Sequence, residues 1–87
     1  MSVFQGGSAY NMVLSVADGY IILTERTFKS YRPNELAEFL FEADRLLREV
    51  RGAQAPPGDQ DAVQKRQRKM QRLQQALTIA NAVRSRH

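Results

Sequence analysis

The residues best suited to chemistry in this 87-residue chain form a basic cluster in its last third. The basic cluster consists of Lys65, Arg66, Arg68, Lys69 and Arg72, and no acidic residue occurs after Asp61. Arginine and lysine at this density attract phosphate groups, and the glutamines between them are suitable hydrogen-bonding partners for the same groups. The cluster therefore predicts a site for a polyanion or an acidic partner, with nucleic acid as one candidate.

Two simpler interpretations of the basic cluster stay open. Basic helix starts are common on solvated surfaces, and the acidic residues between positions 33 and 51 could neutralise these charges. Cations near a helix N-terminus oppose the macrodipole, however, which favours a role other than folding. No Phe or Tyr occurs after Phe41, so the cluster has no aromatic platform of its own for single-stranded nucleic acid. A protein partner is therefore favoured narrowly.

Other reactive residue types are poorly arranged for catalysis. The single histidine is the terminal residue, His87, and the chain has no cysteine. None of its serines lies in a nucleophile-elbow motif. Glu38 and Glu42 are better explained as a solvated acidic face with arginines nearby than as a metal or proton site. We therefore expect no enzymatic activity, no metal site, no cofactor and no small-molecule substrate.

Composition favours a small cytoplasmic protein. The net charge of +4 favours anionic partners. The longest aliphatic run, residues 20–23, is far shorter than the roughly 20 residues that a membrane span requires. The N-terminus has neither the basic nor the apolar region of a signal peptide, and the absence of cysteine excludes disulfides. We therefore expect a cytoplasmic location without membrane association.

The N-terminal part predicts a β-hairpin. From Tyr10 the pattern has a period of two, in which Met12, Leu14 and Val16 alternate with Asn11, Val13 and Ser15. Residues 20–28 are rich in β-branched and aromatic side chains. An Asp-Gly pair between two such runs favours a type I′ turn at Asp18 and Gly19. The shared apolar face would consist of Met12, Leu14, Val16, Ile21 and Leu23. Residues 1–9 are interpreted as a flexible N-terminal arm.

The next segment, residues 33–52, predicts an amphipathic helix. Pro33 suits its first turn and Gly52 the position just beyond its end. The apolar side chains that recur at helical spacing are Leu36, Phe39, Leu40, Ala43, Leu46, Leu47 and Val50. A hairpin alone is not stable. We therefore expect the hairpin and this helix to form one core over residues 10–52.

The remaining chain predicts a linker and a second helix. Pro56 and Pro57 cannot continue a helix, which places a linker at residues 53–60. Asp59 or Asp61 could cap a C-terminal helix over residues 61–87, basic at its start and apolar at its end. The expected fold class is α+β, in the order β-hairpin, helix, proline-bearing linker and helix.

Several apolar side chains are left for contacts with other chains. They are Phe41, Met70, Leu73, Leu77, Ala80 and Val83. Because a chain of this size buries little surface alone, extra burial through self-association would stabilise it. The sequence thus predicts a small non-enzymatic adaptor, regulator or assembly component. It would act as a homodimer or larger assembly with a protein partner, and the alternative is a nucleic-acid-binding protein.

Overall fold

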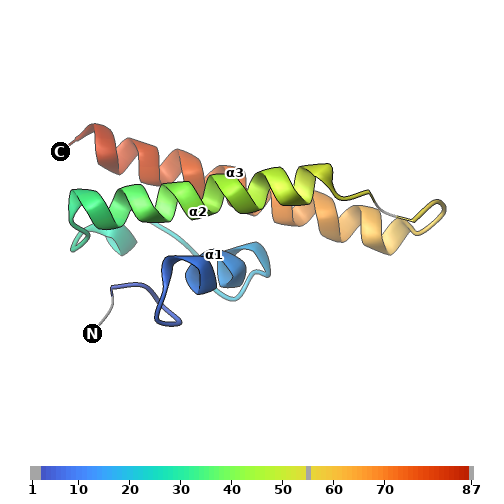
Figure 1. The fold of residues 1–87 in the computed structure, drawn as a ribbon, viewed down its shortest axis with the longest axis horizontal. Helices are drawn as coiled ribbons and strands as arrows, with labels where there is room; N and C mark the ends of the chain where they lie inside the picture. Colours follow the sequence, from blue (N-terminus) through green and yellow to red (C-terminus); the bar gives the residue numbers. More distant parts are fainter. Residues whose placement is uncertain (1–2, 55, 87) are drawn as a thin grey trace.

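The protein is helical in the computed structural model, which describes residues 3–54 and 56–86. Its elements are α1 (Ala9–Ala17), the short 3-10 helix η1 (Glu25–Phe28), α2 (Pro33–Gly52) and α3 (Gln60–Ser85). Helices α2 and α3 form a long antiparallel pair, and α1 lies along one side of it (Figure 1). The described ranges contain no β-strand. The prediction of an α+β protein with an N-terminal β-hairpin is therefore wrong.

Helix α1 occupies the segment that the sequence assigned to the first strand. Its buried side chains are Ala9, Met12, Val13, Val16 and Ala17, at helical spacing. Met12 and Val16 belong both to this pattern and to the alternating one, so the segment fits either period. The Ser8 side chain favours the helix, because its oxygen accepts a hydrogen bond from the Asn11 N–H at 3.1 Å.

The Asp-Gly pair ends α1 instead of turning a hairpin. Gly19 has a φ of +85°, and its N–H donates to the Val16 carbonyl at 3.1 Å. The Tyr20 N–H donates to the Ser15 carbonyl at 2.9 Å. These two bonds form a Schellman motif at the helix C-terminus. A type I′ turn also requires positive φ at the glycine, so Asp18-Gly19 alone could not distinguish the two outcomes.

Residues 20–24 connect α1 to η1 without regular secondary structure. Ile21 and Leu23 are partly buried and pack against the core. The side chains between them alternate outward, since Tyr20 is 83% and Ile22 is 88% exposed. The predicted second strand thus keeps the two-residue alternation of a strand but has no strand beside it.

Helix α2 begins as the sequence predicted, but Gly52, expected just beyond its end, is its last helical residue. Pro33 occupies the first turn, and the helix runs to Gly52. Its buried face consists of Leu36, Phe39, Leu40, Ala43, Leu46 and Leu47. Helices α1 and α3 cover this face in place of the expected hairpin. Phe41 points away from the core and is 64% exposed.

Helix α3 follows the predicted linker. The Asp59 side chain accepts a hydrogen bond from the Ala62 N–H at 3.0 Å, which confirms one of the two expected caps. The helix carries four buried side chains, Leu73, Ala76, Ala80 and Val83. The linker and the first turns of α3 extend beyond α1 in Figure 1. Residues 1–2 of the expected arm, position 55 of the linker and His87 lie outside the described residues.

A row of aromatic rings ties the N-terminal segment to α2. The rings are Phe4, Tyr31, Phe28 and Phe39, with successive centroids 5.5, 5.1 and 4.9 Å apart. The Tyr31 hydroxyl lies 3.0 Å from Met12 Sδ and 3.3 Å from the Val3 carbonyl oxygen. Edge-on ring pairs of this kind add to the stability that burial provides.

We expect the fold to lose stability at high pH through Tyr31. Burial, followed by the nearby Glu35 charge, raises the pKa of this phenol from 10.0 to about 12. The folded chain therefore favours the neutral phenol, and the resulting stability is lost as pH rises from 10 through 12. Urea unfolding across this range measures the loss. Tyr31→Phe should remove that component of the pH dependence, and an unchanged dependence in the variant would contradict the assignment.

Candidate binding groove along helix α3

The basic cluster contains two kinds of residue in the structure. Some stabilise the fold through contacts within the chain, and others remain available to bind a partner. Arg66 belongs to the first kind. Its Nε donates to the carbonyls of Val50 at 3.0 Å and Ala53 at 2.7 Å, and its Nη2 donates to the Arg51 carbonyl at 2.6 Å. These oxygens lie at the end of α2, where helical carbonyls lack partners within the helix. Arg66 thus caps α2 from the neighbouring helix, with its charge placed favourably for the dipole.

Arg72 caps the C-terminal end of α1 in the same way as Arg66 caps α2. Its Nη1 donates to the Ala17 carbonyl at 3.0 Å, and its guanidinium group packs over Gly19. Lys69 forms an ion pair with Asp18 at 3.6 Å, at the same helix end. The cations that oppose the dipole of α3 therefore face the C-termini of α1 and α2. Local sequence gives no signal for this arrangement, because it arises only when the three helices pack.

We expect Arg66 and Arg68 to differ sharply in their effect on stability. Arg66→Gln should lower the free energy of unfolding by about 1–2 kcal/mol, because charge-assisted bonds to the α2 carbonyls are lost. Arg68→Gln is the matched control and should change it by less than about 0.5 kcal/mol, as is usual for a surface site. Urea denaturation measures both. Equal stability of the two variants would contradict the capping role.

The available cations of the cluster are Lys65 and Arg68, which form no hydrogen bond or ion pair within the described part of the chain. They line a hollow of about 500 Å³ together with Lys69 and Arg72 of α3 and with Asp18 and Tyr20 of the α1–η1 connection. The sequence did not predict that Tyr20 lies beside the basic cluster. Tyr20 supplies the aromatic side chain that the basic segment itself lacks, from a part of the chain distant in sequence.

Two further, separate hollows lie between α3 and the segment that runs from the end of α1 to Lys29. The middle one has a volume of about 320 Å³. It is lined by Val16, Gly19, Ile21, Ile22, Leu23, Arg72, Gln75, Ala76 and Ile79. The last one measures about 360 Å³ and is lined by Glu25, Arg26, Lys29, Val83 and Arg86. We refer to the three hollows together as the α3 groove. Six of the nine residues that line the middle hollow have apolar side chains, and both ends of the groove carry several cations.

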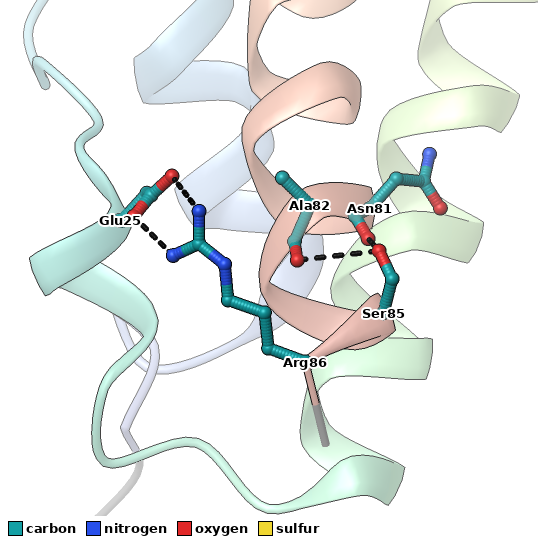
Figure 2. Close-up of polar contacts among 5 residues, drawn as sticks. All are labelled: Glu25, Asn81, Ala82, Ser85 and Arg86. Atoms are coloured by element: carbon teal, nitrogen blue, oxygen red, sulfur yellow. Dashed lines mark hydrogen bonds and ion pairs between the residues drawn. The ribbon is translucent and has the colours of Figure 1, made fainter.

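An ion pair closes the far end of the α3 groove. Arg86 donates from Nη1 and Nη2 to the two carboxylate oxygens of Glu25 at 2.5 and 3.0 Å, as Figure 2 shows. The hydrogen bonds and then the charge of Arg86 hold the pKa of Glu25 below its ordinary value. The contact fixes η1 to the last turn of α3. Arg26 and Lys29 beside it have no side-chain partner among the described residues.

The predicted interface residues occupy different environments. Leu73, Ala80 and Val83 are buried in the core of this chain, and Met70 and Leu77 pack partly against it. Phe41 lies on the exposed side of α2. The structure therefore does not bring these six residues together on one free surface. Self-association stays a prediction, which sedimentation equilibrium at micromolar concentrations tests.

Three acidic side chains of α2 form ion pairs with arginines of the same helix. Arg45 lies 3.4 Å from Glu42 and 3.8 Å from Glu49, and Arg48 pairs with Asp44.

Among the described residues, no group of three or more His, Cys, Asp or Glu side chains could hold a metal ion. None of the helices in the described ranges is long and apolar enough to cross a membrane.

No protein-family model matches the chain, and no curated protein or solved structure is significantly similar to it.

Proposed function

We propose that the chain is a small non-enzymatic adaptor, regulator or assembly component that binds a partner protein in the α3 groove. The observation that carries this proposal is a middle hollow lined by Ile21, Ile22 and Ile79 among other residues, between two cationic ends of the groove. Burying apolar surface beneath a partner stabilises the complex. The flanking charges select and orient an acidic partner. Lys65, Arg68, Arg26 and Lys29 have no partner in the described chain and remain free for this purpose.

Exposed apolar side chains at the rim of the groove support the same function. Tyr20 and Ile22 are the most exposed large hydrophobic residues in the described ranges. Both belong to the connection that forms one wall of the groove. Aromatic residues are enriched in protein interfaces because they combine a large apolar area with a polar group.

The test captures partners with the full chain as bait. Wild type is compared with the double variant Lys65→Gln/Arg68→Gln and with the matched control Arg51→Gln/Arg84→Gln, in native extracts with and without nuclease. We expect a protein that survives nuclease treatment, is retained by wild type and control, and is lost from the groove variant. Retention that does not distinguish the two variants would contradict the proposal.

Nucleic acid is the second candidate, and one observation favours it. Tyr20 lies beside four cationic side chains in the 500 Å³ hollow, which is the combination that stacks a base and neutralises its phosphate. Affinity for DNA or RNA should then fall steeply with salt. Nuclease-sensitive capture in the experiment above would favour this candidate over the protein partner.

A further inference from the structure

We propose that the partner enters the α3 groove as an extended peptide that adds a β-strand to residues 20–24, with apolar residues at its centre and acidic residues at both ends. The inference rests on the proposed function and specifies the chemistry and backbone conformation of the partner. It is carried by three independent features of the groove wall, which are its unpaired backbone, its alternating side chains and the charges at its two ends.

The first feature is the backbone of residues 21–23. The hydrogen bonds of the neighbouring residues are accounted for, since the Tyr20 N–H donates to Ser15 and the Thr24 N–H donates to the Thr27 hydroxyl at 3.1 Å. The amides of Ile21, Ile22 and Leu23 have no such partner within the described chain. An exposed run of unpaired amides and carbonyls is a template for another strand.

The second feature is the alternation of the side chains. Ile21 and Leu23 pack inward and Tyr20 and Ile22 point outward, so the segment presents its side chains as a strand does. The backbone at Thr24 is extended, with φ −133° and ψ 170°. β-Branched and aromatic residues favour this conformation. A strand beside the segment would place alternate apolar side chains toward the middle hollow.

The third feature is charge, which identifies the occupant. Lys65 and Arg68 lie at one end of the groove and Arg26 and Lys29 at the other. Antiparallel pairing of residues 20–24 with a second copy would bring the two cationic ends together, and this repulsion disfavours a homodimer through the segment. A peptide with acidic ends pairs with both cationic ends, and its apolar centre faces the Val16, Ile22 and Ile79 side chains that line the middle hollow.

A synthetic peptide tests the inference directly. Its centre alternates valine and threonine, and each end carries two glutamates. Binding to the full chain is followed by calorimetry, and amide exchange is followed by NMR. Because the Tyr20 and Thr24 amides are already bonded within the chain, the added strand pairs with the amides of Ile21 and Leu23, and we expect their exchange to slow by at least about tenfold in the complex. Methylating alternate backbone nitrogens of the peptide should weaken binding by more than about tenfold, because the inter-strand hydrogen bonds cannot form.

Variants of the chain test the charged ends. Arg26→Gln and Arg68→Gln should each weaken peptide binding by up to about fivefold, and less so at high salt. Arg51→Gln and Arg84→Gln are the matched controls, because Arg51 lies on α2 and Arg84 lies about 120° around α3 from Arg72. Neither control should alter peptide affinity. Circular dichroism verifies that all four variants are folded.

The possible results separate the inference from the proposed function. No binding of this peptide at millimolar concentration overturns the inference, as does binding without slowed exchange in residues 20–24. Equal affinity for a peptide with lysines at its ends overturns the charge assignment and with it the inference. Each of these results leaves the proposed function standing if the capture experiment recovers a protein that depends on Lys65 and Arg68. Failure of that capture refutes the proposed function itself.

Discussion

Replacing Phe39 with alanine is expected to lower the free energy of unfolding by about 3–5 kcal/mol. The Phe39 side chain is fully buried, and its ring packs against Phe28 with centroids 4.9 Å apart. Truncation leaves a cavity where α2 meets η1 and removes a ring from the aromatic row. Since small domains have only about 5–15 kcal/mol of stability, much of the population should unfold near physiological temperature.

Phe41 provides the matched control for this substitution. It lies two residues away on the same helix, and 64% of it is exposed. Phe41→Ala should therefore change stability by less than about 0.5 kcal/mol. Chemical denaturation of both variants measures the difference. Similar losses for the two would show that the buried face of α2 is assigned incorrectly.

Substitution of Gly19 with alanine is expected to have the next largest effect. A residue with a Cβ at φ +85° costs about 1–2 kcal/mol in the left-handed region. The added Cβ would also lie 2.9 Å from the Arg72 guanidinium carbon. The guanidinium is the end of a flexible side chain and must then shift, which should weaken its hydrogen bond to the Ala17 carbonyl and add up to about 1 kcal/mol.

Substitutions at two other glycines separate the cost of backbone strain from the cost of displacing Arg72. Gly7 also has positive φ, at +89°, but a Cβ there meets nothing within 4 Å. Gly7→Ala should show only the backbone strain. Gly52 has neither a positive φ nor a close neighbour, so Gly52→Ala should leave stability unchanged or slightly raised. Thermal unfolding compares the three. A loss at Gly19 no larger than that at Gly7 would show that the Arg72 contact contributes nothing.

The sequence predicted α2 correctly because its signals agree. A proline at the start, a glycine at the end and seven apolar residues at helical spacing all indicate the same element. The segment around α1 gives conflicting signals instead. Met12 and Val16 fit both a helix and a strand, and Asp18-Gly19 suits both a hairpin turn and a helix end. The choice depends on packing against α2 and α3, which no local pattern contains.

Only part of the candidate site could be predicted from the sequence, because the rest of it also depends on how the helices pack. The basic residues were identified from composition, but their division into capping and free side chains depends on which helix ends lie nearby. The position of Tyr20 beside the basic residues was not predicted, because Tyr20 reaches them only through the folded path of residues 18–24. Arg26 and Lys29 join the groove in the same way, through η1 and the end of α3.

The arginine caps on α1 and α2 also bear on how the chain unfolds. The guanidinium groups of Arg66 and Arg72 donate hydrogen bonds to backbone carbonyls at the ends of α2 and α1. These carbonyls belong to residues that lie 13 to 55 positions earlier in the sequence. When α3 separates from the other two helices, both helix ends lose their donors at the same moment. Fraying of α1 and α2 is thereby coupled to detachment of α3, and amide exchange at residues 15–17 and 49–52 should report one cooperative event.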